Sequence, residues 1–374
     1  MRTRDASDLS LAFVIDRFSQ RGAGTEGQLL RLVNELLNRG VDCRLVALQP
    51  TDYLLQQGFP CPWQIVGRDR IADPRTWYAL WRCARDLQRR GVRLAHVFFN
   101  DASVLAPPAF SVTGMPTLIS RRDMGFWYTP SYLRCLRLTR RWIAGCVANS
   151  YAVRRYTSEM ERIPPEAISV IYNGVEADQS RVEAVPALDA LRAEGRVIAV
   201  LVANLRPIKR VQDLVEALGF LRASHPALAV AVIGAGDSAG LQARAADLDV
   251  ADRLVFLGSR DDVGNCLRYA DIGVLCSESE GFSNAIVDYM LRDLPVICTD
   301  TGGNPEAVEN GVTGLLYPVG DVGGLAAALA RLADDKALRG RLGENAGKVA
   351  RTRFAVDRMV AEHIALYRSI LRER

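Results

Sequence analysis

The sequence predicts an α/β protein with two doubly wound domains that face each other across a cleft. Three observations predict this class. Apolar runs of strand length recur along the whole chain, helical patterns separate them, and 374 residues exceed what one hydrophobic core usually serves. Regular alternation of strands and helices implies parallel sheets with crossover helices, and two successive sets of about six strands imply two such domains.

The strands are expected where apolar residues cluster in short runs. The expected strands are 11–15, 44–48, 94–99, 116–119, 144–148, 168–172, 197–203, 228–233, 253–257, 272–275 and 295–298. Helical spacing of leucine and valine predicts a helix over 26–39, and 355–372 forms one long final helix. The weakest patterning, at 179–194, predicts a linker between a domain over 1–178 and a domain over 195–352.

Composition excludes several classes of protein. No apolar run approaches the roughly 18 to 20 residues that span a membrane, and no apolar signal core follows the first residues, so we expect a cytoplasmic protein. The eight cysteines are scattered and expected to be reduced core thiols. The three histidines, with His225 and His363 expected on helical surfaces, indicate no metal site. Residues 1–180 hold 24 arginines against 17 acidic residues, which makes the first half basic.

Doubly wound domains bind ligands at the carboxyl ends of their strands, and the motifs of this sequence lie there. After the first strand, "GAGTEGQ" offers Gly24 for close approach of a phosphate or sugar, with Thr25 and Gln28 as a capping box. An ordinary strand–loop–helix corner is the alternative. In the second half, "NLRPIKR" supplies Arg206 and Lys209, which match the charge of a diphosphate but also suit a solvated loop.

The stretch "SESEGFSNAIVDYMLRD" is predicted to be a strand end, a loop and a helix. Glu280 lies in the loop, Asp288 lies about one turn into the helix, and the backbone N–H groups of residues 283–285 are suited to bind an anion. One carboxylate can then bind sugar hydroxyls while the other binds ribose hydroxyls. This stretch predicts a nucleotide-sugar site.

Glu280 and Asp288 stand at the two acidic positions of the E-x7-E motif of retaining GT-B glycosyltransferases, and residues 280–321 resemble family 4 of these enzymes over their whole length. The resemblance extends to "GAGTEGQLLRLVNELLNRG", "VANSYAVRRY", "VIYNGVE", "LRPIKRVQDLVEAL", "IGAGD" and "VFLGSRDDV". It implies the GT-B fold, with Rossmann-like domains and a C-terminal helix over 353–374 that crosses back to the first domain. The implied reaction transfers a sugar from a nucleotide-sugar donor with retention, and without a metal ion or cofactor.

The resemblance also implies roles for individual residues. Lys209 matches the diphosphate-binding lysine, Glu280 the carboxylate that faces the donor sugar, and Asp288 the ribose carboxylate. The family usually carries an arginine where this sequence has Asn204. The positive charge of that arginine must then come from Arg206. The expected donor-binding residues are Gly24, Asn204, Gly234, Arg260, Gly281, Phe282, Ser283, Asn284, Ala285 and Asp288. Asp288 is one methylene shorter than the usual glutamate.

The acceptor side is less determined, because many relatives carry a histidine where this sequence offers Arg121, Arg122 and Asp123. The expected acceptor is a glycan or a polyprenyl- or lipid-linked sugar, and the donor is expected to be a UDP-sugar rather than a GDP-sugar. Arginines and aromatic residues over 121–142 indicate either a solvated helix face or an anionic membrane surface as a further partner. No nucleic-acid module is present. A catalytically silent partner and a sugar-nucleotide epimerase remain the alternatives.

Overall fold

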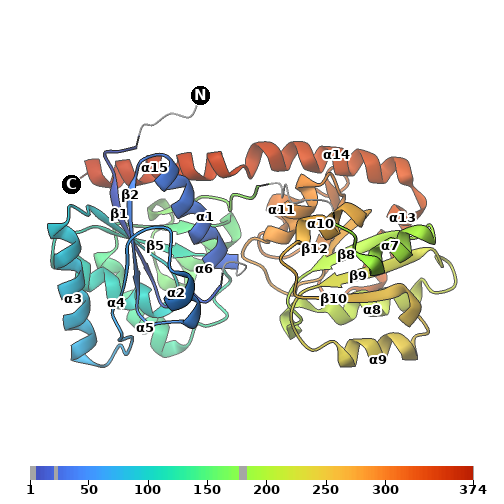
Figure 1. The fold of residues 1–374 in the computed structure, drawn as a ribbon, viewed down its shortest axis with the longest axis horizontal. Coiled ribbons are helices and arrows are strands. Elements are labelled where there is room, and N and C mark those ends of the chain that lie inside the picture. The colour runs from blue at the N-terminus through green and yellow to red at the C-terminus, as the bar shows by residue number, and fades with distance from the viewer. Residues whose placement is uncertain (1–5, 21–23, 177–182, 374) are drawn as a thin grey trace. The chain divides into compact units, whose positions relative to one another are not determined.

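The computed structural model describes residues 6–20, 24–176 and 183–373, and it divides into two compact units (Figure 1). Unit 1 comprises the chain up to Gly174 and again from Val356, and unit 2 comprises Val175–Ala355. Each unit holds one sheet, of seven and of six strands, and the pairings described in both sheets are parallel. The predicted α/β class with two doubly wound domains is confirmed.

Unit 1 carries the sheet with strand order β3-β2-β1-β4-β5-β6-β7. Its elements are β1 Ser10–Ile15, α1 Gly24–Asn38, β2 Asp42–Ala47, α2 Asp52–Gln57, β3 Trp63–Ile65, α3 Pro74–Arg89, β4 Leu94–Val97, α4 Asn100–Ser111, β5 Thr117–Arg121, α5 Pro130–Thr139, η1 Arg140–Trp142, β6 Gly145–Ala148, α6 Tyr151–Glu161, η2 Pro165–Ala167, β7 Ile168–Val170 and α15 Val356–Arg372.

Side chains that alternate along β1 divide the core of unit 1 between the two faces of the sheet. Phe13 belongs to one buried cluster with Leu29 of α1 and Tyr367 of α15, whereas Val14 belongs to a second cluster with Leu80 of α3. Successive strand residues point to opposite faces, so both faces need helical cover. Figure 1 shows α15 in red beside α1, and these two helices are in contact.

Unit 2 carries the sheet with strand order β10-β9-β8-β11-β12-β13. Its elements are α7 Pro186–Ala193, β8 Val197–Val202, η3 Pro207–Lys209, α8 Val211–Phe220, β9 Leu228–Ile233, α9 Ala239–Asp247, η4 Ala251–Arg253, β10 Leu254–Gly258, α10 Val263–Cys266, η5 Leu267–Tyr269, β11 Ile272–Leu275, α11 Asn284–Leu291, β12 Val296–Thr299, α12 Asn304–Ala307, β13 Gly314–Tyr317, α13 Val322–Asp334 and α14 Lys336–Arg353.

The strand order of each sheet reverses at its first strand. In unit 2 the chain builds outward from β8 through β9 to β10, then returns to β11 on the other side of β8. The chain therefore leaves β8 toward β9 and leaves β11 toward β12, in opposite directions along the sheet. Doubly wound sheets bind ligands at such a switch point, at the carboxyl ends of the strands. This topology is what positions the candidate site of unit 2.

The structure differs from the sequence-based expectations at two edge strands. β3 and β13 were not among the expected strands, and each lies at the edge of its sheet. Edge strands are covered less completely, and the three residues of β3 are only half-buried, so its sequence lacks a long apolar run. The other strands differ from their expected bounds by a few residues at each end.

The expected linker over 179–194 also needs correction. Residues 179–182 lie outside the described residues, and most of the remainder forms α7, which buries Leu188 and Leu191 and contacts β8 and η5. α7 is thus a packed helix of unit 2. At the other end of the chain, α15 is part of unit 1.

Two smaller expectations were wrong. α1 begins at Gly24, so Thr25 lies inside its first turn, and Gln28 donates to the Gly174 carbonyl oxygen at 3.0 Å instead of forming a capping box. His363 is fully buried rather than on a helical surface, because its face of α15 packs on the sheet of unit 1. The eight cysteines are free; six are buried, as expected of core thiols, whereas Cys83 and Cys135 are half-buried. Among the described residues, no helix is long and apolar enough to span a bilayer.

Candidate functional site

The loops after β8 and β11 meet at the carboxyl edge of the unit 2 sheet. Lys209 ends the short helix η3 after β8, and its Nζ lies 2.5 Å from Glu280 Oε1 in the loop after β11. Ser277 Oγ donates to the same Glu280 oxygen at 2.6 Å, and its side chain is fully buried. The Glu278 amide also donates to the Ile208 carbonyl oxygen at 2.8 Å, which ties the two loops together. The sequence predicted Lys209 and Glu280 as site residues, and the structure brings them into contact.

Two glycines allow the close approach of backbone around Glu280. Gly302 has φ +53°, and a Cβ there would lie 1.9 Å from the Glu280 carbonyl oxygen. A Cβ on Gly234, at the end of β9, would lie 2.0 Å from the Ala203 carbonyl oxygen. Neither contact is tolerable for a side chain, so both positions require glycine. These glycines allow the loops to pack closely at the edge of the sheet where Glu280 lies.

Helix α11 follows Glu280 directly and is fixed by a buried tyrosine. The Tyr289 hydroxyl accepts a hydrogen bond from the Val202 amide at 2.6 Å and donates to the Val274 carbonyl oxygen at 3.2 Å. Its ring packs over Gly273, where a Cβ would lie 2.4 Å from a ring carbon. Tyr289 thus anchors α11 to β8 and β11 together. The N-terminus of α11 and Asp288, which is half-buried on this helix, take their positions from that anchor.

The start of α11 can receive an anion. Ser283 occupies the N-cap position, and its side chain makes no capping hydrogen bond among the described residues. Backbone N–H groups in the first turn of a helix have no partner within the helix and carry partial positive charge. Ser283, Asn284 and Ala285 therefore lie where the sequence predicted an anion cradle, in the segment that directly follows Glu280 and Gly281.

The remaining predicted donor residues have structural partners of their own. Asn204 Oδ1 accepts from the Ala235 amide at 3.2 Å, which joins the loops after β8 and β9. Arg260 makes two hydrogen bonds of 2.7 Å to Asp262, and this guanidinium lowers the Asp262 pKa to about 2. The Phe282 side chain is buried, with its ring centroid 5.2 Å from that of Phe354. Phe282 would therefore contact a ligand through its backbone and not through its ring.

The cations after β8 differ in their engagement. Arg210 forms a double hydrogen bond with Asp213, at 2.8 and 3.1 Å, so its charge is already paired. Arg206 is exposed and has no side-chain partner within the described part of the chain. Lys209 is paired with Glu280, so among these three cations Arg206 alone has no carboxylate partner in the described part of the chain. The role of Lys209 and Arg206 at a diphosphate stays a prediction.

In unit 1 the two arginines at the end of β5 have opposite environments. Arg121 is buried and binds both oxygens of the buried Glu161, at 2.5 and 3.0 Å. The Tyr128 hydroxyl also donates to Glu161. The charge of Glu161 raises the pKa of Arg121 against the effect of its burial. The sequence predicted Arg121 as an acceptor-side residue, but the charge of Arg121 is neutralised by its buried ion pair with Glu161.

Arg122 is the next residue and points to the other face of the sheet. Its guanidinium donates to Asn173 Oδ1 at 2.5 Å and lies over the Phe98 ring. Burial lowers its pKa to about 10. Asp123 Oδ1 accepts from the Gly125 amide and from Trp127 Nε1, and burial raises its pKa. A small pocket of about 20 Å³ brings the predicted acceptor residues together; it is lined by Thr25, Phe98, Phe99, Asn100, Ser120, Arg121, Arg122, Asp123 and Trp127.

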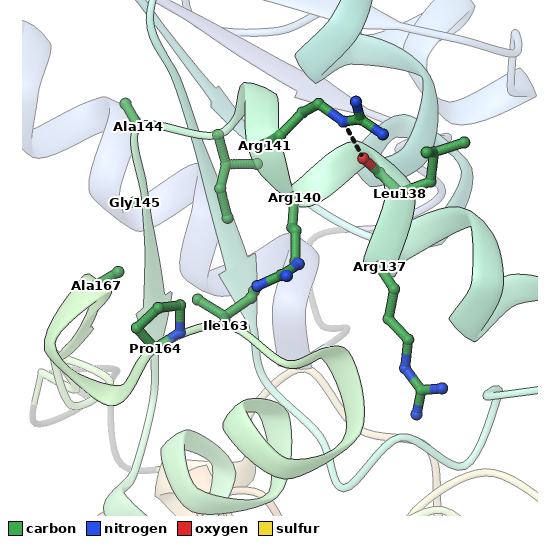
Figure 2. A pocket seen from close by; sticks show the side chains of 10 residues that line it. Arg137, Leu138, Arg140, Arg141, Ala144, Gly145, Ile163, Pro164 and Ala167 are labelled. Carbon is green, nitrogen blue, oxygen red and sulfur yellow. Dashed lines mark hydrogen bonds between the residues drawn. The ribbon is translucent and has the colours of Figure 1, made fainter.

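A larger pocket of about 550 Å³ lies elsewhere in unit 1, at the start of β6 (Figure 2). Three arginines line it: Arg137, Arg140 and Arg141. Each donates to a backbone carbonyl oxygen, and no carboxylate of a described residue pairs with any of them. Figure 2 shows the Arg140 guanidinium close to Ile163 and Pro164, and the lining also includes the apolar residues Leu138, Ile143 and Ala167. This pocket combines uncompensated positive charge with apolar surface.

Solved structures of other proteins identify the fold. A solved structure of Anabaena HepE in complex with UDP superposes with a TM-score of 0.83 at 20% identity, covering 96% of this chain and all of that one. A glycosyltransferase from Rickettsia africae superposes with a TM-score of 0.84 at 18% identity, covering 98% of this chain and all of that one. The fold is therefore GT-B.

The family follows from two sequence models. Residues 22–179 match the model described as Glycosyltransferase Family 4, and residues 189–349 match the model described as Glycosyl transferases group 1. Together the two models cover most of the chain. The chain belongs to the group 1, family 4 glycosyltransferases.

Individual curated relatives share between a quarter and a third of their residues with this chain over the matched regions. The N-acetyl-alpha-D-glucosaminyl L-malate synthase of Bacillus anthracis is 31% identical over 48% of this chain and 48% of its own length. The phosphatidyl-myo-inositol mannosyltransferase of Mycolicibacterium smegmatis is 33% identical over 58% of this chain and 53% of its length. In both cases the match spans about half of the relative. An Escherichia coli UDP-Gal:alpha-D-GlcNAc-diphosphoundecaprenol alpha-1,3-galactosyltransferase is 24% identical over 84% of this chain and 86% of its length.

Proposed function

We propose that this protein is a retaining glycosyltransferase that transfers a sugar from a nucleotide-sugar donor to a glycan or lipid-linked acceptor. The observation that carries the proposal is the contact of Lys209 with Glu280 beside the start of α11. A cation in contact with a carboxylate, with a helix N-terminus three residues further along the chain, can bind a diphosphate and the sugar attached to it. The family of the chain supports the same reaction.

In this mechanism the residues of unit 2 act on the leaving group. Lys209 and Arg206 neutralise the charge that develops on the diphosphate as the bond from the anomeric carbon to the phosphate oxygen breaks. Glu280 binds hydroxyls of the transferred sugar, and Ser277 holds the Glu280 carboxylate in place. The acceptor hydroxyl attacks the anomeric carbon from the side of the departing diphosphate and gives its proton to a diphosphate oxygen. Attack from that side retains the anomeric configuration, and the scheme requires neither a metal ion nor a cofactor.

The donor is proposed to be a UDP-sugar. The solved Anabaena structure is named for its complex with UDP, and the Escherichia coli relative is named for a UDP-galactose donor. Asp288, on the helix that Tyr289 anchors, is proposed to bind the ribose hydroxyls of the nucleotide. Carboxylates accept hydrogen bonds from paired hydroxyls well, and such bonds to a charged group are stronger than neutral ones.

The acceptor is proposed to bind in unit 1, at the pocket of Arg122 and Asp123. The raised pKa of Asp123 makes its carboxylate a stronger hydrogen-bond acceptor for a sugar hydroxyl. The relatives are named for diphosphoundecaprenol-linked and phosphatidyl-myo-inositol acceptors, which supports a role in the synthesis of a bacterial polysaccharide or glycolipid. We propose that the protein acts on such an acceptor in the cytoplasm, at the inner face of the membrane.

An anionic membrane surface is proposed as a further partner. The supporting observation is the pocket of Arg137, Arg140 and Arg141, whose uncompensated charge and apolar lining suit lipid headgroups (Figure 2). Flotation with vesicles of phosphatidylglycerol tests this, using a variant with all three arginines replaced by glutamine. A matched variant replaces three arginines of α3, namely Arg82, Arg85 and Arg89. Only the first variant is expected to lose binding, and equal losses would contradict a specific surface.

The transferase proposal is tested with a panel of UDP- and GDP-sugars, each incubated alone and with candidate acceptors. Transfer is followed by mass spectrometry, and the anomeric configuration of the product is read by NMR. Transfer with retention supports the proposal. Conversion of the donor without an acceptor would indicate an epimerase instead, and donor binding without any turnover would indicate a catalytically silent partner.

A further inference from the structure

The two arginines that end β5 in unit 1 separate into a paired and an unpaired cation. Adjacent residues at a strand end point to opposite faces of the sheet. Arg121 therefore meets Glu161 of α6, while Arg122 reaches Phe98 and Asn173 on the other face. Arg121 is paired with a buried carboxylate, whereas Arg122 has no carboxylate partner in the described part of the chain. Of these two arginines, Arg122 is therefore the one whose charge can act on a ligand.

Arg122 has no ion-pair partner among the described residues. Its hydrogen-bond partner, the Asn173 side chain, is neutral, and no described carboxylate lies within ion-pair distance. The titratable groups around it are the buried His96, His363 and Tyr367. Burial lowers the pKa of both histidines and raises that of the tyrosine, so all three are neutral near pH 7. Asp123 lines the same pocket, and its Oδ1 accepts hydrogen bonds from the Gly125 amide and from Trp127 Nε1. The Arg122 Nε is buried without a partner within the described chain.

Arg122 is half-buried by its exposed area, with its Nε fully covered. A cation that is partly removed from water without a counter-charge is destabilising unless something pairs with it. Arg122 lines the pocket of about 20 Å³ that Thr25, Ser120 and Asn100 also line. That volume admits about one oxygen-sized group. The hydroxyl and amide groups around it can donate further hydrogen bonds. A single oxygen of a carboxylate or phosphoryl group fits both the size and the charge of the pocket.

Two helices, α1 and α4, begin at this pocket, and the first amides of α4 already have a partner. The first amides of α4, at Asn100, Asp101 and Ala102, donate to the Asp16 carboxylate at 2.7 to 3.2 Å. Thr25 lies in the first turn of the 15-residue α1, where backbone N–H groups favour an anion. The dipole of α1 therefore adds to the charge of Arg122.

We infer that the pocket of Arg122 binds an anionic group of the acceptor substrate, a carboxylate or a phosphoryl group close to the hydroxyl that receives the sugar. The inference rests on the proposed transferase function and narrows its acceptor to an anionic molecule. Arg122 then selects the acceptor by charge, while Arg121 maintains the fold beside it. Neutral glycans lack the group that would compensate Arg122.

Binding of small anions to the full chain tests the pocket independently of activity. The probes are methyl phosphate and acetate, with ethylene glycol as the neutral comparison, and the dissociation constants are measured by NMR titration. Replacing a charged hydrogen-bond donor should weaken anion binding about 10- to 100-fold in Arg122→Gln. Arg122→Lys should keep part of the affinity. Arg31→Gln is the matched control, because Arg31 is half-buried in the same unit and donates to the Gly174 carbonyl oxygen outside the pocket; it should change the affinity less than about twofold.

The outcomes separate this inference from the proposed function. Equal anion affinity in wild type and Arg122→Gln, or equal losses in Arg122→Gln and Arg31→Gln, would overturn it. A loss of UDP affinity as large as the loss of methyl phosphate affinity would assign the anion to the donor, which also overturns it. With matched acceptors that differ in one anionic group, Arg122→Gln should lower kcat/KM for the anionic member alone. If no acceptor receives sugar, the transferase proposal fails, and the binding data still decide whether the pocket is an anion site.

Discussion

Lys209 Nζ lies 2.5 Å from Glu280 Oε1, although 70 residues separate them along the chain. The contact arises because β8 and β11 are neighbours in the sheet, so the loops that follow them share one edge. In the absence of a donor each side chain neutralises the other. A donor would exchange this contact for two new ones, with the diphosphate at Lys209 and sugar hydroxyls at Glu280.

The first prediction compares two neighbouring cations. Lys209→Ala should lower the affinity for UDP by about 1.5 to 3 kcal/mol, the scale of a hydrogen bond to a charged group. Arg210→Ala is the control, because Asp213 already holds Arg210 by two hydrogen bonds. Isothermal calorimetry measures both affinities. Equal effects of the two substitutions would mean that Lys209 contributes only general positive charge.

The second prediction concerns Ser277, which the sequence did not single out. Its hydroxyl donates to Glu280 Oε1 at 2.6 Å, so Ser277→Ala should leave Glu280 less well positioned. We expect kcat to fall about five- to tenfold, equivalent to the roughly 1 kcal/mol of a typical hydrogen bond, with little change in the affinity for UDP. Ser277→Thr keeps the hydroxyl and should restore most of the activity. A parallel loss of UDP affinity and kcat would indicate a general disturbance of the loop.

The third prediction tests Asp288 as the residue that binds the ribose. Asp288→Asn should weaken UDP binding by about 1 to 3 kcal/mol if the carboxylate binds both ribose hydroxyls. A carboxylate that only favours the dipole of α11 would contribute a few tenths of a kcal/mol. Calorimetry with UDP and its 2′,3′-dideoxy analogue distinguishes the two roles. Wild type should discriminate between these ligands strongly and Asp288→Asn weakly, and equal discrimination would rule out the ribose contact.

The candidate site of unit 2 could be predicted because its residues lie at strand ends within recognisable motifs. Lys209, Glu280 and the start of α11 each follow an apolar run, and parallel topology brings the carboxyl ends of strands to one edge. The pairing of Arg121 with Glu161 could not be predicted in this way. It joins a strand end to the last residue of a helix 40 positions later, and nothing local distinguishes Arg121 from Arg122.

Contacts between residues far apart in the sequence also explain why some sequence-based expectations about the fold were wrong. The helical pattern of α15 is compatible with His363 on an exposed face or on a buried face. The packing of α15 against the rest of unit 1 buries it, and the sequence does not show that packing. The edge strand β3 is half-buried and carries little apolar sequence, whereas β13, with the sequence GLLY, is mostly buried and was missed because its apolar run is only three residues long. Ser277 and Gly302 act through contacts with Glu280 that depend on the exact course of the loops, so their types alone gave no signal.

The fourth prediction concerns the pH dependence of stability. Burial, followed by the negative charge of Asp16, raises the pKa of Asp101 to about 6. The folded state therefore binds a proton that the unfolded state has already released between about pH 4 and 6. Because the unfolded state binds fewer protons in this range, the contribution of Asp101 to stability falls as the pH rises through it and stays low at pH 7.

Asp101→Asn removes this dependence and keeps an oxygen that can accept from the Tyr132 hydroxyl. Because Asp101 is only half-buried, we expect a gain of about 1 to 2 kcal/mol at pH 7 and nearly none at pH 4. Urea unfolding at a series of pH values measures the difference. A gain that is equal at both pH values would show that the substitution acts by some means other than the ionisation of Asp101.

The last prediction separates the structural arginine from the ligand-binding one. Arg121→Gln leaves the buried Glu161 without its counter-charge, and breaking a buried ion pair costs about 3 to 5 kcal/mol of unfolding free energy. Glu161→Gln should cost a similar amount, because Arg121 is then the uncompensated charge. The double variant removes both charges and should lose much less stability than the sum of the single losses.

Arg122→Gln is the matched control in the adjacent position. It removes a cation that has no buried carboxylate, so its unfolding free energy should stay within about 1 kcal/mol of wild type. Urea unfolding of the four variants measures all these values. Additive losses for Arg121 and Glu161 would mean that the two side chains do not stabilise unit 1 as a pair, and a loss in Arg122→Gln as large as that in Arg121→Gln would show that Arg122 is also structural.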